Sequence, residues 1–416
     1  MTKRMLLAVL LLIVFALPAG CQKQGGEPTQ PTAPAPTILP TPTPEPAPTP
    51  TPDRVGEALA GMTVEQKAAQ LLVAGIEGTE PGEDAVQAIQ GYQVGGVILF
   101  GRNVESAEQL AALTNGLKEL NGDYTPLFLC VDQEGGRVDR MPPEVSRTPS
   151  AWSVGQTLDT EGVGVSYGEL LAAECAAFGF NMDFAPSLDI WSNPDNTVIG
   201  DRAFGNDWEW TAFFGMSAVE GMEKQGTVIP VVKHFPGHGD TAVDSHTALP
   251  VVDKTLEDLW QSELVPFDMV LSGQFWGEPV MEPTPAVMVA HILLSQIDPD
   301  NPASLSPEVV TGLLREEMGY EGVVCTDDLT MGAISNTYGM GEAAVLAVEA
   351  GCDLLLVCHG ADNLAEAHAA LVEAVDSGCI PEERLDESVY RVLSLKTVYG
   401  LSNAPVEAPD IEALND

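Results

Sequence analysis

Basic residues are scarce in this sequence of 416 residues. It holds 18 Lys and Arg residues against 61 Asp and Glu residues, which gives a formal net charge of −43 at pH 7. A surface this acidic repels phosphate backbones and anionic wall polymers, so the composition argues against nucleic-acid binding. Hydrophobic residues still make up 45% of the chain, which is enough to bury a large core. We therefore expect a folded protein with an acidic surface.

Long hydrophobic runs are also lacking. The apolar run at the N-terminus, Met5–Leu17, spans thirteen residues, whereas a transmembrane helix needs about 20. Lys3 and Arg4 precede this run and Ala19-Gly20-Cys21 follows it. That order is typical of a bacterial lipoprotein signal over residues 1–21, with Cys21 lipidated. We therefore expect an extracytoplasmic protein anchored to the cell membrane through Cys21; the alternative is ordinary secretion with a free Cys21.

Proline is concentrated in one segment. Residues 22–52 hold eleven Pro and seven Thr residues. Proline removes backbone donors and favours extended polyproline II structure, so this segment is expected to be a disordered, semi-rigid linker. The remaining chain is expected to form one folded domain over residues 53–402, followed by an acidic C-terminal tail over residues 403–416.

Cysteine pairs with metal-binding spacing are absent, since no C-x-x-C occurs among the seven cysteines. Apart from Cys21, three of them (Cys130, Cys325 and Cys358) lie inside apolar, strand-like runs. Cysteines in such runs are expected to be buried free thiols. The sequence therefore predicts neither a zinc site nor any other cofactor.

Short, continuously apolar runs recur along the expected folded domain, as in parallel strands that are covered on both faces. There are eight of them: Leu71–Ala74, Gly96–Phe100, Leu127–Asp132, Asn181–Ala185, Val228–Lys233, Ala286–Ala290, Gly322–Thr326 and Asp353–Val357.

Helical patterns lie between these runs and after the last one. They cover Val64–Gln70, Ser106–Leu120, Gly162–Phe178, Trp208–Lys224, Leu256–Leu271, Pro307–Met318, Glu342–Ala350, Asn363–Val375 and Glu382–Val398. Alternation of eight strands with helices predicts an α/β protein with a single (β/α)8 TIM-type barrel.

Ionisable residues occur at or near the ends of the predicted strands. They are Asp132, Asp183, Lys233, His234, His291, Asp327 and His359. Catalytic groups of (β/α)8 barrels sit at the carboxyl ends of the strands. The sequence therefore predicts an active site at that rim.

Three motifs at this rim carry possible chemistry. In the loop from Lys233 to His246, Asp244 can orient His246 and make it more basic, so the two form a plausible proton-transfer pair. Asp327, at the end of the seventh run, can act as a nucleophile. The Gly-containing turn from Asp132 to Arg140 suits hydrogen bonding to a polyhydroxylated ligand.

These motifs, together with Gly95–Phe100 and Gly200–Gly205, resemble glycoside hydrolase family 3. More narrowly, they resemble its single-domain bacterial β-N-acetylglucosaminidases. The resemblance covers about residues 55–400 and rests on five motifs in the expected order. It implies a retaining exo-β-N-acetylglucosaminidase that acts without a cofactor and without a protein partner on peptidoglycan fragments or related oligosaccharides.

The resemblance also implies roles for individual residues. Asp327 matches the nucleophile that forms a glycosyl-enzyme intermediate, His246 matches the general acid/base, and Asp244 matches its dyad partner. A further set matches residues that bind the N-acetylglucosamine unit: Asp132, Arg140, Arg202, Lys233 and His234.

Three alternatives stay open at this point. The same residues could serve a phosphorylase, since some relatives with an Asp-His dyad are thought to use phosphate instead of water. A metal-dependent hydrolase is a second alternative, because His234, His238, Asp240, Asp244 and His246 superficially resemble metal ligands. The third is a non-catalytic lipoprotein that binds sugar.

Overall fold

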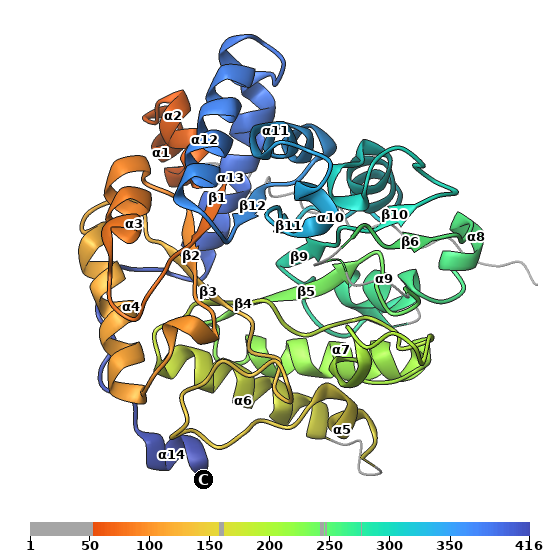
Figure 1. The fold of residues 1–416 in the computed structure, drawn as a ribbon. Coiled ribbons are helices and arrows are strands. Elements are labelled where there is room, and N and C mark those ends of the chain that lie inside the picture. Colours follow the sequence, from red (N-terminus) through yellow and green to blue (C-terminus); the bar gives the residue numbers. More distant parts are fainter. Residues whose placement is uncertain (1–52, 158–161, 242–244, 246–247, 276) are drawn as a thin grey trace, which may run out of the picture. The chain divides into compact units, whose positions relative to one another are not determined.

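The structure is a computed structural model that describes residues 53–157, 162–241, 245, 248–275 and 277–416. Eight parallel strands close into a barrel, with helices arranged around it (Figure 1). In chain order the strands are β1 (Leu72–Gly75), β2 (Gly96–Ile98), β3 (Phe128–Val131), β4 (Met182–Asp183), β5 (Ile229–Phe235), β9 (Ala286–Val289), β11 (Val323–Asp328) and β12 (Leu354–Val357). The predicted (β/α)8 barrel and all eight predicted strand regions are confirmed.

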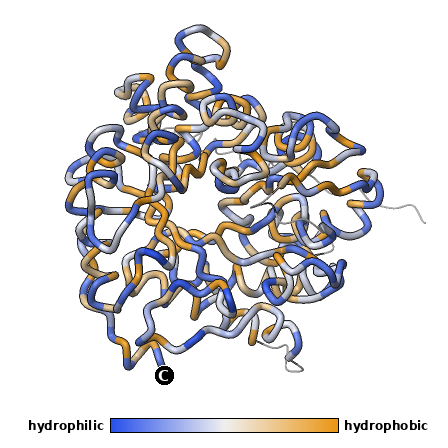
Figure 2. The backbone as a smooth tube through the Cα atoms, viewed as in Figure 1, coloured by the Kyte–Doolittle hydropathy of each residue, from blue (hydrophilic) through white to orange (hydrophobic). Residues whose placement is uncertain are grey.

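The barrel closes between its first and last strands. In the register of β1, Val73 lies opposite Leu356 of β12 on one side and Gly96 of β2 on the other. Side chains that alternate along the strands fill the inside, among them Phe128, Met182 and Met288. The opposite face of each strand packs under the helices. Because both faces are buried, the strands read as continuous apolar runs, and hydrophobic residues follow the central strands in Figure 2.

The helices between the strands largely match the predicted ones. They are α2 (Val64–Gln70), α4 (Ala107–Asn121), α6 (Val163–Ala177), α7 (Trp208–Glu223), α8 (Leu256–Leu259), α9 (Leu264–Ser272), the π-helix η5 (Glu308–Glu317), α11 (Met340–Ala350), α12 (Ala361–Asp376) and α13 (Glu382–Val398). Local capping fixes several starts. At α2, for example, Thr63 and Gln66 form a reciprocal capping box.

The predicted single helix over Leu256–Leu271 is wrong. The chain forms α8, a turn and then α9, in which Pro266 is the third residue. Proline lacks an N–H and its ring clashes with the carbonyl four residues before it, so a continuous helix cannot pass through this position without a kink or a break.

Further short elements lie in the loops and were not predicted. They are α1 (Arg54–Ala60), α3 (Glu83–Val86), η1 (Gln87–Tyr92), η2 (Gly101–Asn103), α5 (Ala151–Gly155), η3 (Gly200–Arg202), η4 (Ala303–Leu305), α10 (Gly332–Ser335), α14 (Ile411–Asn415), the strand pair β6 (Val251–Val252) with β10 (Leu293–Leu294), and the hairpin β7 (Gln274–Phe275) with β8 (Glu278–Pro279).

The acidic segment over residues 403–416 lies against the barrel domain. Asn403 Nδ2 donates to the Gly122 carbonyl oxygen at 2.8 Å, and Val406 N–H donates to Asn115 Oδ1 on α4 at 2.8 Å. At the end of α14, Asn415 Oδ1 accepts from Ser146 N–H at 2.7 Å. Hydrogen bonds between asparagine side chains and backbone groups thus hold residues 403–416 against the barrel domain.

The six cysteines in the described residues are free. Five are buried, among them Cys130, Cys325 and Cys358 as predicted, and Cys379 is exposed. None of the helices in the described ranges is long and apolar enough to span a membrane. Residues 1–52, with the predicted signal, Cys21 and the linker, lie outside the described residues.

Candidate active site

A cavity of about 380 Å³ opens at the carboxyl ends of the barrel strands. It is lined by Ile98, Phe100, Arg102, Asp132, Glu134, Val138, Arg140, Phe184, Val198, Ile199, Arg202, Lys233, His234, His238, Ser245, Met288, Asp327, Asp328, Met331, Leu356, Cys358 and His359. All six of the predicted site residues that the structure describes line this cavity: Asp132, Arg140, Arg202, Lys233, His234 and Asp327. Larger hollows lie elsewhere, but none brings these residues together.

The loop after β3 brings carboxylates into the cavity through a glycine turn. Gly135 and Gly136 have φ angles of 72° and 57°, in the left-handed region that favours glycine. A side chain at Gly135 would also clash with the Pro149 carbonyl oxygen. The turn therefore needs both its backbone conformation and its lack of side chains, and it folds the loop so that Asp132, Glu134 and Arg140 reach one cavity.

Lys233, near the end of β5, is buried and bridges two of these carboxylates. Its Nζ lies 2.6 Å from Asp132 Oδ1 and 2.6 Å from Glu134 Oε1. Burial alone would lower the pKa of Lys233, but the charges of Asp132 and Glu134 raise it above its ordinary value. Lys233 is therefore a fixed positive charge that orients Asp132 at the cavity wall.

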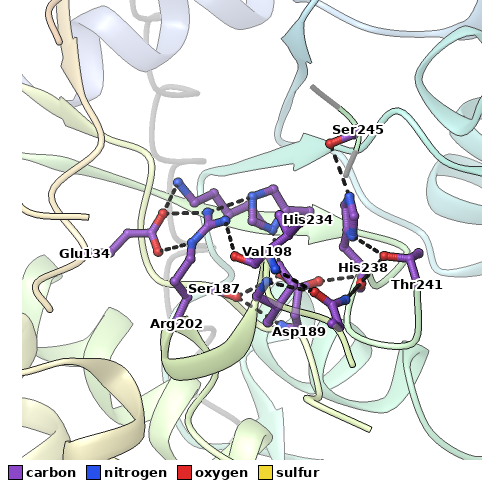
Figure 3. Close-up of polar contacts among 12 residues, drawn as sticks. Glu134, Ser187, Asp189, Val198, Arg202, His234, His238, Thr241 and Ser245 are labelled. Atoms are coloured by element: carbon purple, nitrogen blue, oxygen red, sulfur yellow. Dashed lines mark hydrogen bonds and ion pairs between the residues drawn. The ribbon is translucent and has the colours of Figure 1, made fainter. Parts of the chain in front are cut away.

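Glu134 holds Arg202 in a bidentate ion pair (Figure 3). The two guanidinium-to-carboxylate distances are both 2.8 Å. Burial would raise the pKa of Glu134, but Arg202 and Lys233 hold it well below its usual range. The paired fork fixes the plane of the Arg202 guanidinium, which lets this side chain meet a ligand in one orientation.

His234 stands between Arg202 and a buried carboxylate, Asp189 (Figure 3). Its Nε2 is 3.1 Å from Arg202 Nη2, and its Nδ1 is 2.5 Å from Asp189 Oδ2. A guanidinium can only donate, so Nε2 accepts and Nδ1 carries the proton that is donated to Asp189. Asp189 is thus an orienting partner for His234.

His238 ties the loop after β5 together. Its Nδ1 lies 2.8 Å from Thr241 Oγ1 and its Nε2 lies 3.3 Å from Ser245 Oγ. Burial lowers the pKa of His238. Both contacts of its ring are hydrogen bonds within the loop. Ser245 is further held by Ala333 N–H, which donates to its carbonyl oxygen at 3.0 Å.

Asp327, at the end of β11, has few bonds to the protein. Among the described residues, its carboxylate accepts one hydrogen bond, from Asp328 N–H to Oδ1 at 2.8 Å. Burial would raise its pKa, but His291, His234, this backbone donor and Lys233 lower it below the ordinary value. Asp327 is therefore an ionised carboxylate that lines the cavity and accepts one hydrogen bond from the described residues.

The neighbouring Asp328 has a different environment. Its carboxylate accepts from Thr330 N–H at 2.9 Å, from Thr330 Oγ1–H at 2.5 Å and from Cys358 N–H at 3.1 Å. His291 Nε2 donates to the Asp328 carbonyl oxygen at 3.0 Å. These contacts use Asp328 to hold the ends of β11 and β12, which leaves Asp327 as the candidate nucleophile.

Arg140 is the cationic group with fewest bonds in this cavity. Its backbone N–H donates to Gln133 Oε1 at 2.7 Å. Its Nε is buried, and no hydrogen-bond partner for it occurs among the described residues. A guanidinium in this state is available to a ligand that brings its own acceptors.

The expectation that Asp183 contributes to the rim is wrong. Its neighbours Met182 and Phe184 point into the barrel, so alternation along β4 directs Asp183 outward, under the helices. Its Oδ1 accepts from Gln133 N–H at 2.8 Å. Burial raises the pKa of Asp183 well above its usual value, and this carboxyl group does not line the cavity.

Two predicted catalytic residues, Asp244 and His246, lie outside the described residues. In the parts of the chain that are described, no three His, Cys, Asp or Glu side chains gather as a metal site would need. His234 and His238, two of the possible metal ligands, already share their ring nitrogens with the partners given above.

The sequence reasoning missed Glu134 and Asp189 as members of the site. Glu134 lay inside the Asp132–Arg140 motif but was given no role, and Asp189 follows the fourth strand. Their partners are 68 and 45 residues away in the chain. Only their position after a strand end could have pointed to them.

Comparison with known sequences agrees with this geometry. Residues 63–395 match the profile of the glycosyl hydrolase family 3 N-terminal domain. The chain is 34% identical over 341 residues to β-hexosaminidase A from Pseudoalteromonas piscicida, covering 76% of this chain and 56% of that protein. It is 38% identical over 293 residues to a β-hexosaminidase from Alkalilimnicola ehrlichii, covering 69% and 80% of the two chains.

Comparison with solved structures gives the same result. A glycoside hydrolase family 3 β-N-acetylglucosaminidase from Paenibacillus sp. str. FPU-7 superposes with a TM-score of 0.77 at 44% identity. The match covers 82% of this chain and 63% of that one. The chain thus spans between half and two thirds of the length of the Pseudoalteromonas and Paenibacillus relatives.

Proposed function

The chain belongs to glycosyl hydrolase family 3, and on that basis we propose that it is a retaining exo-β-N-acetylglucosaminidase. It removes terminal, non-reducing N-acetylglucosamine from oligosaccharides. The names of its relatives support the substrate, since these are β-hexosaminidases and a β-N-acetylglucosaminidase. The cavity supports the reaction, because it combines an ionised carboxylate with a fixed set of hydrogen-bonding groups.

In the first step, Asp327 attacks the anomeric carbon of the bound sugar. A covalent bond forms between a carboxylate oxygen and this carbon, while the bond to the leaving oxygen breaks. His246, oriented by Asp244, donates a proton to the leaving oxygen, so no alkoxide is released. A second carboxyl group about 5–5.5 Å away normally does this in retaining enzymes; a neutral imidazole avoids repulsion between two anions.

In the second step, water replaces the leaving group. His246 now accepts a proton from water, whose oxygen attacks the anomeric carbon from the same side that the leaving group left. The bond to Asp327 breaks, and the carboxylate is restored. Two inversions at one carbon retain the configuration of the sugar.

The observation that carries this proposal is the environment of Asp327. It is ionised, it lines the cavity, and one backbone N–H is its only hydrogen-bond donor among the described residues. Asp132, Arg140, Arg202, Lys233 and His234 share the same cavity and suit the hydroxyl and acetamido groups of the sugar.

The resemblance and the N-terminal sequence support a proposal for the natural substrate and the location. We propose that terminal N-acetylglucosamine of peptidoglycan fragments is removed at the cell surface, by a lipoprotein anchored through Cys21. The Pro- and Thr-rich residues 22–52 would then separate the barrel from the membrane.

Turnover of 4-nitrophenyl N-acetyl-β-D-glucosaminide by wild type and by Asp327→Ala and His246→Ala tests the proposed function. We expect activity in wild type, its collapse in Asp327→Ala, and a smaller loss in His246→Ala, because nitrophenolate leaves without much help from an acid. The product should be free N-acetylglucosamine whether or not phosphate is present. An inactive wild type would refute the proposed activity, and a sugar 1-phosphate product would replace hydrolysis by phosphorolysis.

A further inference from the structure

The loop that carries Asp132 and Arg140 needs support from behind, because both proposed sugar-binding residues lie at its ends. A binding group that is loose by about 1 Å can cost on the order of 100-fold in rate. The side chains of Asp132 and Glu134 line the cavity, while that of Gln133, between them, does not. Gln133 is fully buried on the other side of the loop.

The backbone N–H and the side-chain amide of Gln133 have hydrogen-bond partners in this buried position. Its backbone N–H donates to Asp183 Oδ1 at 2.8 Å. Its Oε1 accepts from Arg140 N–H at 2.7 Å, and its Nε2 donates to Asp139 Oδ1 at 3.2 Å. The side chain of Gln133 therefore holds the backbone of Arg140, and the backbone N–H of the same residue holds the chain next to Asp132 against Asp183.

The remaining partner of Gln133 is Glu174 on α6. Gln133 Nε2 donates to Glu174 Oε2 at 2.8 Å, and Thr148 Oγ1 donates to Glu174 Oε1 at 2.6 Å. Glu174 is 1% exposed, and no Lys or Arg side chain among the described residues bonds to it. A carboxyl group buried among neutral donors is costly, so a purely structural position would favour an apolar residue.

Other ionisable groups near Glu174 do not neutralise it. Asp139 lies near Glu174, on the loop that runs from Asp132 to Arg140, and forms an ion pair with Arg147 at 3.1 Å. Tyr167 and Cys175 belong to its own helix, and Asp183 lies on β4. Burial raises the pKa of Glu174 to about 7.

We propose that Gln133 and Glu174 act as a pair of positioning residues for sugar binding, which hold Asp132 and Arg140 at the cavity from the helix layer behind it. The inference rests on the proposed function and extends it to residues that do not touch the substrate. Because the pair sets the position of binding groups and does not contact Asp327, its loss changes substrate affinity and leaves the chemical steps intact.

The test is a reciprocal exchange of the two side chains. Gln133→Glu keeps the acceptor for Arg140 N–H but places a third carboxyl group against Glu174 and Asp139. At pH 8 we expect KM for 4-nitrophenyl N-acetyl-β-D-glucosaminide and the inhibition constant of N-acetylglucosamine to rise about tenfold, with kcat within about threefold of wild type. Lowering the pH should relieve the defect, because a protonated carboxyl group can donate to its neighbour.

The double variant Gln133→Glu/Glu174→Gln restores an amide-to-carboxylate hydrogen bond in the reverse direction. We expect its KM to return to within about threefold of wild type. Thr148→Val is the matched control: it removes the donor to the other oxygen of Glu174 and keeps the bond to Gln133, so it should lower stability without changing KM. Should Gln133→Glu fail to fold, Glu174→Met decides, with the same expected rise in KM.

A folded Gln133→Glu or Glu174→Met protein with wild-type KM at pH 8 would overturn the inference. So would a defect that the exchange does not reduce, or an equal rise in KM in Thr148→Val. A wild type that does not turn over the glycoside would instead refute the proposed function, so the two failures are distinguishable.

Discussion

The two ends of the barrel treat buried charge in opposite ways. At the amino end of β12, Asp353 is fully buried and accepts from Arg315 Nη2 at 2.6 Å, Ser388 Oγ at 2.6 Å and Arg391 Nη1 at 3.2 Å. At the carboxyl end of β11, Asp327 accepts from one backbone N–H of a described residue. The ion pairs and hydrogen bonds of Asp353 stabilise the fold, whereas the carboxylate of Asp327 can interact with a ligand.

Two buried lysines also differ, but in the reverse sense. Lys233 meets two carboxylates at the cavity, which raise its pKa. Among the described residues, Lys396, on α13 at the other end, donates to two neutral oxygens, Gln70 Oε1 at 2.9 Å and the Gly95 carbonyl at 2.8 Å. Burial there lowers its pKa to about 7. Two carboxylates thus maintain the charge of Lys233, whereas burial opposes the charge of Lys396.

The largest effect on activity is expected from substitution of Asp327. Asp327→Asn keeps the shape and removes the nucleophile, so we expect kcat to fall on the order of 10⁴-fold. Because the native carboxylate accepts one hydrogen bond from the described residues, the melting temperature should stay at or above that of wild type. Steady-state kinetics and calorimetry on the same preparation check both points. A variant that is inactive because it is unfolded would not support the account.

Asp353→Asn should have the converse result. It removes a charge from between Arg315, Arg384 and Arg391, so we expect the free energy of unfolding to fall by about 3 kcal/mol. Activity per folded molecule should not change, because this carboxylate is far from the cavity residues. Urea denaturation followed by active-site titration separates the two. A kcat loss in fully folded protein would contradict the comparison.

Arg140→Met tests whether a side chain of the cavity contributes to substrate binding and not to the stability of the fold. The guanidinium has a buried Nε without a hydrogen-bond partner among the described residues, so removing it should cost the fold little. A charge-assisted hydrogen bond to the sugar is worth about 1.5–3 kcal/mol, so KM should rise roughly 10- to 100-fold. Kinetics against 4-nitrophenyl N-acetyl-β-D-glucosaminide give the answer. An unchanged KM would remove Arg140 from the proposed sugar site.

The smallest expected effect is the pH dependence contributed by Lys396. Its pKa is about 7 in the folded protein against an ordinary 10.5. Between these values the unfolded state binds a proton that the folded state lacks, so this group makes stability rise with pH. Below pH 7 both states bind the proton and the slope vanishes. Lys396→Met should therefore flatten the rise between pH 7 and 9 in urea denaturation, and an unchanged slope would contradict the lowered pKa.

The barrel was readable from the sequence because its strands are buried on both faces. Runs such as Phe128–Val131 and Leu354–Val357 are apolar without a break, and helical patterns separate them. The prediction failed where a local effect overrides the pattern. Pro266 divides one apolar helical stretch into α8 and α9, which periodicity alone does not show.

The sequence predicted many of the residues that line the cavity, but not the hydrogen bonds and ion pairs between them. Residue type at a strand end placed Asp132, Lys233 and Asp327 at the rim, and the motifs supplied Arg140 and Arg202. The direction of Asp183 was predicted wrongly, because one residue of register along β4 decides which face it points to. The partners of Glu134 and His234 come from other strands and loops, and no sequence pattern gives such pairings.

Covalent trapping of the glycosyl-enzyme intermediate tests whether Asp327 is the nucleophile. Wild-type residues 53–416 would be incubated with a 5-fluoro N-acetylglucosaminyl fluoride, which slows the second step more than the first, and analysed by intact-mass and peptide mass spectrometry. We expect one sugar residue per chain, attached to the peptide that contains Asp327, and no adduct in Asp327→Asn. An adduct on another residue, or steady turnover of the nitrophenyl glycoside without any adduct, would contradict it.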